Sequence, residues 1–219
     1  MDSCVDFAYV DVVDSEDEEN NAYEAAEQQS PCRVESGMYT IMGEFHEVNE
    51  DRGVVQSLDN ETLHYFAVFD GHTGSELGSA CSDFASKHLH YEVTRAVEEN
   101  GDMQRGLRDA FVEVNRKWVE YAEHHENEVL RDVGSTALVC LLKGRHLCVA
   151  NAGDCRALCY DKHAVYELSV DHQAGADAER ARIEAAGGVV LDGRVYGNLE
   201  PSRGFGDIEQ QQIHVDRLR

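Results

Sequence analysis

The segment Phe66-Ala67-Val68-Phe69-Asp70-Gly71-His72-Thr73-Gly74 constrains the fold of this chain more than any other stretch. Its first four residues are apolar and predict a buried strand, and the residues that follow place a carboxylate, a glycine and a histidine at the strand end. Rigid strand ends are where proteins present binding and catalytic groups. The segment therefore predicts a functional site at the edge of a β-sheet.

The residue types in this segment point to metal chemistry. Asp70 is suited to bridging two metal ions, the carbonyl of Gly71 to binding one of them, and His72 to moving a proton. The upstream pair Glu50-Asp51 follows another apolar stretch and is expected to face the same metals. Hard oxygen ligands of this kind favour magnesium or manganese over zinc. The alternatives are a solvated turn at Glu50-Asp51 and a structural hydrogen bond of His72 near a helix start.

The rest of the chain reads as strands, then two helices, then strands again. An asparagine–glycine break separates the two helices, and Asp102 is the expected N-cap of the second. Turn signals at Lys143-Gly144-Arg145 and Asp192-Gly193 predict two hairpins. The expected strands include 38–42, 53–56, 65–69, 136–142 and 147–151, and the expected helices cover 77–89, 102–121 and 178–186. This order predicts an α+β fold with antiparallel sheets rather than a parallel βαβ sheet.

Charge and cysteine usage restrict the partners. The formal net charge of −24 argues against binding to nucleic acid or to an anionic membrane surface, because both need basic patches. No apolar run approaches the roughly 20 residues of a membrane span, and we see no secretory signal. The cysteines that lie in or beside apolar runs predict reduced core thiols; these are Cys140, Cys148, Cys155 and Cys159. A cytoplasmic or nuclear protein is expected.

Residues 1–35 differ in composition from residues 36–219. The first segment contains the block Asp14-Ser15-Glu16-Asp17-Glu18-Glu19 and has little to bury. It is interpreted as a disordered acidic leader, either a solvated extension or an interaction tail. The second segment is interpreted as one folded domain.

Several motifs occur in an order that resembles the metal-dependent protein phosphatases, the PPM or type 2C serine/threonine class. They run from about Gly37 to Asp207, which is most of the chain. The motifs are Asn49-Glu50-Asp51-Arg52, Val68-Phe69-Asp70-Gly71-His72-Thr73-Gly74, Gly134-Ser135-Thr136-Ala137, Gly153-Asp154-Cys155-Arg156, Asp171-His172 and Ser202-Arg203-Gly204-Phe205-Gly206-Asp207.

The resemblance implies two antiparallel β-sheets packed as a sandwich between helix layers. It also implies hydrolysis of phosphoserine or phosphothreonine by a bridging water held between two Mn²⁺ or Mg²⁺ ions. Asp70 would bridge the ions and the Gly71 carbonyl would bind one of them. Glu50 and Asp51 would hold metal-bound waters.

For the remaining motif residues the resemblance implies further roles. His72 would protonate the leaving oxygen. Asp154 would help to hold a third, weaker ion, with a plain hairpin-turn residue as the alternative. Arg203 and Asp207 are interpreted as structural ion-pair residues.

Two departures from the family pattern leave two functions open. His46 stands where the family carries an arginine that binds the substrate phosphate, and a histidine cannot make that forked contact. Two further metal-binding aspartates of the family, expected after Asp207, have no counterpart, so the domain is interpreted as incomplete at its C-terminus. The chain is interpreted as a phosphatase acting on a phosphoprotein, or alternatively as an inactive phosphatase-like module that binds a protein partner. A monomer is expected in either case.

Overall fold

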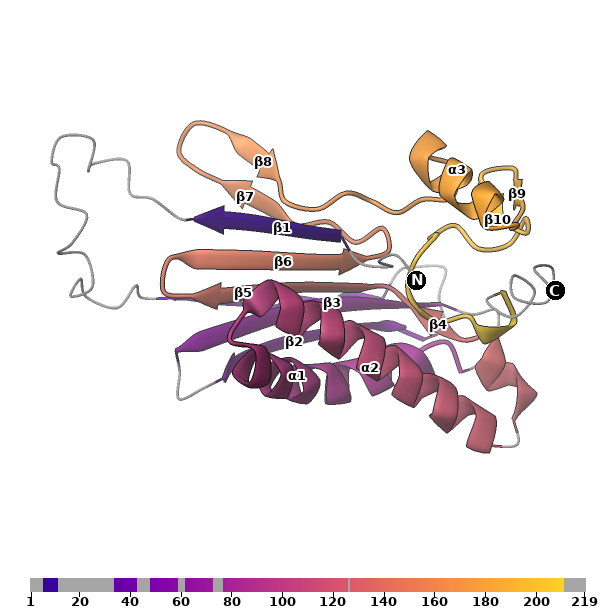
Figure 1. Cartoon of the computed structure of the whole chain (residues 1–219), viewed down its shortest axis with the longest axis horizontal. Coiled ribbons are helices and arrows are strands. Elements are labelled where there is room, and N and C mark those ends of the chain that lie inside the picture. Colours follow the sequence, from indigo (N-terminus) through magenta and orange to yellow (C-terminus); the bar gives the residue numbers. More distant parts are fainter. Residues whose placement is uncertain are drawn as a thin grey trace, which may run out of the picture.

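The computed structural model of this chain describes residues 34–42, 48–58, 62–72, 77–125 and 127–210 in full, together with the backbone of residues 6–11. A seven-stranded antiparallel sheet forms its centre (Figure 1). Its strands are β1 (Asp6–Asp11), β2 (Asp51–Leu58), β3 (Leu63–His72), β4 (Gly134–Ser135), β5 (Ala137–Lys143), β6 (His146–Ala152) and β11 (Phe205–Gly206). They follow the order β1-β6-β5-β3-β4-β11, and β2 also pairs with β3.

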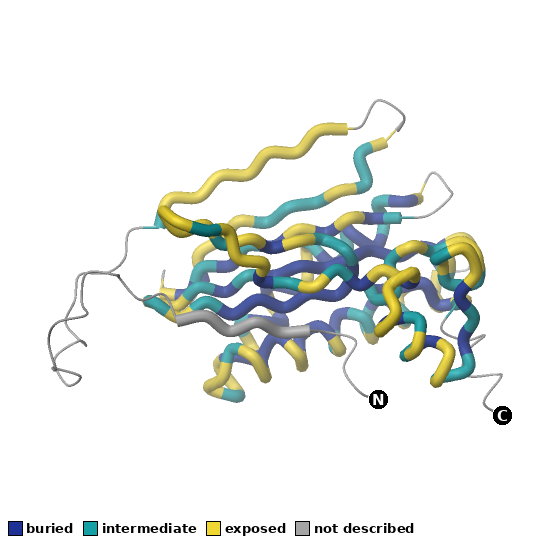
Figure 2. The backbone as a smooth tube through the Cα atoms, turned by 90° about the horizontal axis from the view of Figure 1, so that it is seen from above, coloured by how far each residue is buried: buried dark blue, intermediate teal, exposed yellow. Residues whose placement is uncertain are grey.

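Two long helices, α1 (Ala80–Asn100) and α2 (Met103–His124), cover one face of this sheet (Figure 1). Buried residues gather in the central strands and on the inner faces of the helices (Figure 2). The largest buried side chains include Trp118 and Phe111 from α2 and Tyr65 and Phe69 from β3. Burial of this apolar surface is the main contribution that stabilises the domain.

Strand β3 is buried on one face only. Its burial alternates along the strand, with Tyr65 and Phe69 facing the helices and Val68 and Asp70 exposed. A period of two is what a pleated strand imposes. The expected buried strand is therefore buried on one face only, and this alternation directs Asp70 away from the core.

The opposite face of the sheet carries a smaller cluster. Leu138 of β5 and Val149 of β6 pack with Ala157 and Leu168, which flank the hairpin of β7 (Leu158–Tyr160) and β8 (Val165–Glu167). Antiparallel sheets with helices on one side confirm the predicted α+β class. No helix in the described ranges combines the length and apolarity needed to cross a bilayer.

The turn between α1 and α2 follows from its sequence. Gly101 adopts a left-handed conformation with φ of 67° and ends α1, and the side chain of Asp102 accepts a hydrogen bond of 2.7 Å from the backbone N–H of Arg105. Both features were expected from the residues. The hairpins at Gly144 and at Asp192-Gly193 are confirmed in the same way, because these residues take positive φ between paired strands.

A buried ion network joins α3 (Asp177–Ala185) to the segment that leads into β11. Glu179 is buried and accepts hydrogen bonds from Arg203 (2.6 and 3.0 Å), from Arg182 (2.8 Å) and from the hydroxyl of Ser202 (2.5 Å). The expectation that Arg203 is a structural ion-pair residue is confirmed, with Glu179 as its partner.

The remaining elements of the described structure are β9 (Val190–Leu191), β10 (Arg194–Val195) and the 3₁₀ helix η2 (Glu128–Arg131).

Two expectations about the first fifty residues are wrong. Residues 38–42 form no strand, because they make no ladder with a neighbour and their apolar side chains are exposed, Ile41 by 70%. Within the expected disordered leader, residues 6–11 form strand β1, which pairs with β6 in antiparallel register. The backbone of β6 offers a free row of hydrogen-bonding groups on that side, and β1 satisfies it. The rest of residues 1–33 lies outside the described residues.

Replacing Glu179 by glutamine should destabilise the domain by about 3 kcal/mol at about pH 7, because it leaves the buried guanidinium of Arg203 poorly compensated. Although burial opposes it, hydrogen bonding to Arg203, Arg182 and Ser202 holds the pKa of Glu179 well below its usual 4.5. The stabilisation is therefore complete above about pH 4.5 and is lost as the pH falls further. Urea unfolding at about pH 7 and about pH 3.5 should show the difference between parent and variant shrinking in acid. A constant difference would contradict the prediction, and Glu184→Gln, on the exposed side of α3, is the control.

Replacing Asp102 by alanine should cost about 1 kcal/mol of folding free energy, because the backbone N–H of Arg105 loses its acceptor at the start of α2. Asp102→Asn keeps an acceptor oxygen and should cost only a few tenths of that amount. Equal losses for the two variants in urea unfolding would show that the cap is not what residue 102 contributes.

Candidate active site

The register between β2 and β3 sets two carboxylates side by side. Asp51, the first residue of β2, pairs directly across from Asp70 near the end of β3. The backbone of Asp70 is held from its other side by Thr136, whose hydroxyl accepts from the Asp70 N–H (3.0 Å) and whose N–H donates to the Asp70 carbonyl (2.9 Å). The two aspartates therefore meet on a strand end that is hydrogen-bonded on both edges.

Glu50 is tied to the beginning of α1. Its carbonyl accepts hydrogen bonds from the N–H of Gly71 (3.3 Å) and from the hydroxyl of Ser82 (2.6 Å). A Cβ atom at Gly71 would lie 2.7 Å from the Glu50 carbonyl oxygen and 2.7 Å from the Ser82 hydroxyl oxygen, which explains the glycine at that position. The Glu50 carboxylate lies against Gly78, so it points toward the turn before α1, whereas Asp51 faces Asp70.

Asp154 follows the end of β6 and lies close enough to Asp70 to act on it electrostatically. Its turn is fixed by the preceding Gly153, whose N–H donates to the ring of His172 (3.1 Å) and whose carbonyl accepts from the side chain of Asn151 (3.0 Å). Asp154 is thus both a turn residue and a member of the carboxylate group, so the two alternatives for it are compatible.

Asp70 has a perturbed carboxyl group. Residue Asp70 is solvent-exposed, yet neighbouring protein atoms partly desolvate its carboxyl group, and this desolvation together with the charges of Asp51 and Asp154 raises its pKa from 3.8 to about 6. The nearby His72 partly opposes the shift. Like charges held at one strand end favour either a bound proton or a bound cation.

His72, the last residue of β3, contacts a carboxylate that comes from the far end of the described chain. Its Nε2 lies 3.1 and 3.0 Å from the two carboxylate oxygens of Asp207. Burial lowers the pKa of His72, but the hydrogen bond and charge of Asp207, with Asp70 and Asp154, raise it above its usual 6.5. Asp207 is an ion-pair residue, as expected, but its partner is a residue of the site.

Sequence reasoning missed this partner because the two residues lie 135 positions apart and no local pattern connects them. The only available signal was the histidine itself, since a histidine that moves a proton is commonly oriented by a carboxylate.

Cys155 also borders the site. Its sulfur lies 3.1 Å from the hydroxyl of Thr136, the residue that holds Asp70. Burial raises the pKa of Cys155 to about 11, so the thiol stays protonated near neutral pH. The five cysteines in the described ranges are free, as expected for reduced residues.

The donor set fits a hard divalent cation. Carboxylate and carbonyl oxygens dominate the strand ends, and a cation would relieve the repulsion that raises the pKa of Asp70. Within the described ranges, no three His, Cys, Asp or Glu side chains form a ready-made metal-binding group. His46, Thr73 and Gly74 lie outside the described residues.

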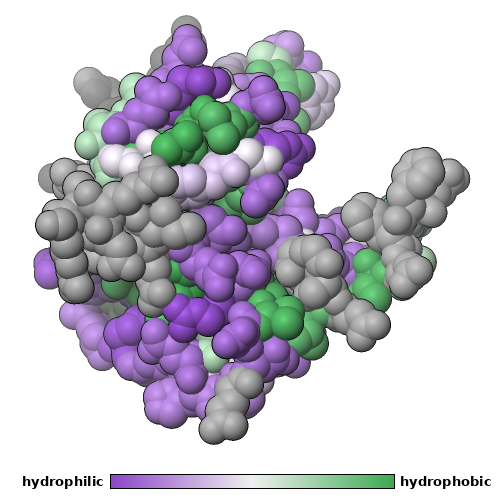
Figure 3. Space-filling view, turned by 90° about the vertical axis from the view of Figure 1, so that its right-hand side faces the viewer, coloured by the Kyte–Doolittle hydropathy of each residue, from purple (hydrophilic) through white to green (hydrophobic). Residues whose placement is uncertain are grey.

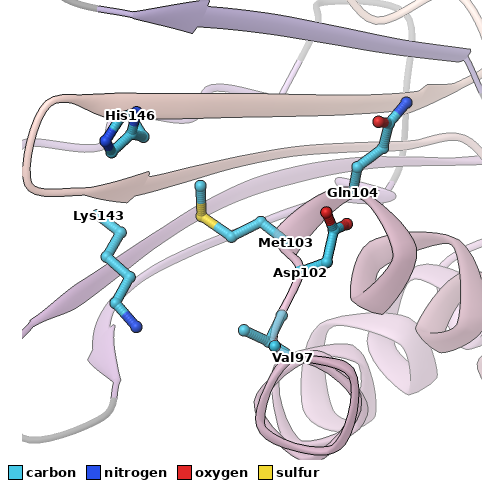
Figure 4. A pocket seen from close by; sticks show the side chains of 7 residues that line it. Val97, Asp102, Met103, Gln104, Lys143 and His146 are labelled. Carbon is cyan, nitrogen blue, oxygen red and sulfur yellow. The ribbon is translucent and has the colours of Figure 1, made fainter.

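The site lies at the end of the molecule where β3 and β6 finish, and the surface on that side is mostly hydrophilic (Figure 3). A separate cavity of about 580 Å³ lies at the other end of β5, between the α1–α2 turn and the tip of the β5–β6 hairpin. Its lining includes Asp102, Met103, Lys143 and His146 (Figure 4). About six residues of β5 separate it from the carboxylates, so it is not part of the same site.

Known sequences provide an independent comparison. The family model described as Protein phosphatase 2C matches residues 37–216. Probable protein phosphatase 2C 5 of Paramecium tetraurelia is 34% identical over 181 residues, which cover 79% of this chain and 60% of that protein. Protein phosphatase 2C homolog 2 of Hypocrea jecorina is 40% identical over 158 residues, covering 69% of this chain and 34% of that protein.

Solved structures share the fold. A sex determining protein of C. elegans superposes with a TM-score of 0.64 at 23% identity, covering 78% of this chain and 44% of the other. A phosphatase from Toxoplasma gondii gives a TM-score of 0.59 at 23% identity, covering 74% of this chain and 61% of the other.

This chain spans 60% of the length of Probable protein phosphatase 2C 5 and 52% of that of Probable protein phosphatase 2C 6, both of Paramecium tetraurelia. Its family match nevertheless runs through β2, β3, both long helices and the strands that precede Asp154 and Asp207. The carboxylate-bearing strand ends and the matched length agree, and the chain belongs to the protein phosphatase 2C family.

Proposed function

We propose that this chain is a metal-dependent protein serine/threonine phosphatase that hydrolyses phosphoserine or phosphothreonine. The observation that carries the proposal is the pairing of Asp51 with Asp70 at a strand end beside His72, where Asp154 also lies close enough to act on Asp70 electrostatically. Membership of the family supports the same reaction. In this proposal the substrate is a phosphoprotein. We also propose that the protein is a monomer and is cytoplasmic or nuclear.

Mn²⁺ or Mg²⁺ would be held by Asp70 and by the carbonyl of Gly71, with Asp51 and Glu50 contributing through bound waters. When bound, the ions supply a water of lowered pKa and neutralise charge on the phosphate. A third, weaker ion would use Asp154. The repulsion among these carboxylates supports a cation at this strand end.

The residues of the chain have separate tasks. The pairing with β2 and the bonds to Thr136 hold the backbone of Asp70, so that its carboxylate would be presented to the ions from a fixed strand end. His72 would give a proton to the seryl or threonyl oxygen as the bond to phosphorus breaks. An alkoxide is a poor leaving group, so this proton transfer matters for the natural class of substrate.

A second candidate function is a phosphatase-like module that binds a protein partner without hydrolysing it. The observation that favours it is His46, which occupies the position of the arginine that binds phosphate in the family. A mostly neutral imidazole cannot replace the forked guanidinium contact. Substrate affinity should fall, although Asp70, Asp51 and Asp154, three of the carboxylates that would hold the metals, are present. The two further aspartates that the family resemblance implies after Asp207 have no counterpart in this sequence.

Hydrolysis of a phosphothreonine peptide should require added Mn²⁺ or Mg²⁺, and Asp70→Asn should lower the rate at least about 100-fold, because the variant removes the carboxylate shared by the ions. Phosphate release from the parent chain, with and without Mn²⁺, is the measurement. Asp161→Asn is the matched control, since Asp161 lies in the exposed turn between β7 and β8 and an asparagine there keeps the acceptor for the turn. Background rates for the parent in all conditions would favour the binding module.

Saturating Mn²⁺ should raise the unfolding temperature of the parent by ~5–10 °C, because a ligand at about 100 times its dissociation constant stabilises a protein by about 2.7 kcal/mol. The shift should vanish in Asp70→Asn and persist in Asp161→Asn. A shift that survives in Asp70→Asn would place the metal elsewhere.

Without metal, the unfolding temperature of Asp70→Asn should be at least that of the parent, because the variant removes a charge that Asp51 and Asp154 repel.

A further inference from the structure

The contact between His72 and Asp207 is built by three strands. Gly134 of β4 pairs with His72 of β3 on one side and with Gly206 of β11 on the other. Because residue 134 has no side chain, the ring of His72 and the carboxylate of Asp207 meet above its backbone. A methyl group at Gly134 would collide with both of them.

The backbone of Asp207 is held in an unusual conformation. Its φ is 50°, in the left-handed region that residues with a side chain rarely adopt, and its N–H donates to the carbonyl of Val133 (3.1 Å). The neighbours Phe205 and Ile208 are buried in the main core. These neighbours and the hydrogen bond keep the strained residue in place, and such strain is commonly found at functional sites.

The environment of the pair is also well anchored. The N–H of Gly206 donates to the side chain of Asn115 on α2 (3.0 Å), and the buried Glu179–Arg203 ion pair fixes the segment just before β11. The side chain of Asp207 is only 11% exposed and that of His72 is 23% exposed. The carboxylate therefore has one orientation relative to the ring.

We propose that Asp207 is the positioning residue of His72 and that Nδ1, not Nε2, delivers the proton to the leaving oxygen. This inference rests on the proposed function. An ionised carboxylate only accepts hydrogen bonds, so Nε2 must be the donor toward Asp207. Nδ1 is then the ring nitrogen that remains for the substrate.

In the proposed step, water forms the new bond to phosphorus, and the bond to the seryl or threonyl oxygen breaks with its electron pair on that oxygen. The oxygen takes the proton from Nδ1 and leaves as the alcohol. His72 becomes a neutral ring whose remaining proton stays on Nε2, hydrogen-bonded to Asp207. The proton lost by the attacking water passes to solvent, and Nδ1 takes up a proton from solvent before the next turnover.

A purely structural ion pair would behave differently from a positioning residue. Loss of a structural contact lowers the amount of folded protein and affects all substrates alike. Loss of the positioning contact affects only substrates whose leaving oxygen needs a proton. An aryl phosphate with an acidic phenol as leaving group needs little protonation, whereas a phosphothreonine peptide needs it fully.

The test compares the full chain with Asp207→Asn on these two substrates in the presence of Mn²⁺. We expect Asp207→Asn to lower kcat for the phosphothreonine peptide by about 10- to 100-fold and to change kcat for 4-nitrophenyl phosphate by less than about threefold. In a His72→Gln background, Asp207→Asn should have little further effect, because residues that act as a unit are not additive. Equal losses on both substrates, or additive losses in the double variant, would overturn the proposal.

A second readout does not depend on activity. Proton–nitrogen correlation spectra of the imidazole at one fixed pH should show a slowly exchanging proton on Nε2 of His72 in the parent. This signal should broaden or disappear in Asp207→Asn and remain in Asp161→Asn. An unchanged Nε2 signal in Asp207→Asn would overturn the positioning role.

The two readouts separate this proposal from the proposed function. If the parent hydrolyses neither substrate, the phosphatase proposal fails, and the Nε2 signal alone decides whether Asp207 holds the ring. If Asp207→Asn does not fold, Asp207→Glu serves in its place: it keeps the charge but displaces it by one methylene, and it should lower only the rate with the phosphothreonine peptide. Equal rates for Asp207→Glu and the parent on that peptide would count against the proposal.

Discussion

The hydrogen-bonded register of β3 is the constraint on which the rest of the structure depends. On one edge it places Asp51 opposite Asp70, and on the other it places Gly134 opposite His72. A shift by one residue would turn Asp70 toward the helices and Phe69 toward solvent, because the side-chain period of a strand is two. The burial of Tyr65 and Phe69 on the helix-facing side of β3 prevents that shift. Core packing and the chemistry of the site are therefore specified by the same ladder.

Electrostatics gives the strand end its character. The charges of Asp51 and Asp154 act on Asp70, and the raised pKa of Asp70 reflects the desolvation of its carboxyl group together with this repulsion. The cation proposed for the site would remove the conflict. The proposed cation would also reconcile the high negative charge of the chain with a phosphate substrate, because bound divalent ions would reverse the local sign of the charge.

The segments that follow the sheet serve the site from a distance. Glu179 buries its charge between two arginines, and this network holds the residues before β11 so that Asp207 reaches His72. A buried ion pair contributes little net stability, because desolvation of the charges offsets their attraction, but it can favour one arrangement of the chain over others. Family relatives of greater length carry the same matched region, which leaves the activity of this chain a proposal for experiment.

Local sequence alone determined the two long helices, the cap at Asp102, the glycine turns and the emergence of Asp70, Gly71 and His72 at a strand end, because these depend on nearest neighbours and on side-chain period. Two predictions from local sequence were wrong. Residues 38–42 have the apolar character of a strand but lack a pairing partner in the described structure. Residues 6–11 form a strand through a pairing with β6 that spans some 140 positions. Only the tertiary structure decided that Asp207 faces His72. That contact depends on two strand pairings across Gly134, and no short-range pattern in the chain encodes a distance through space.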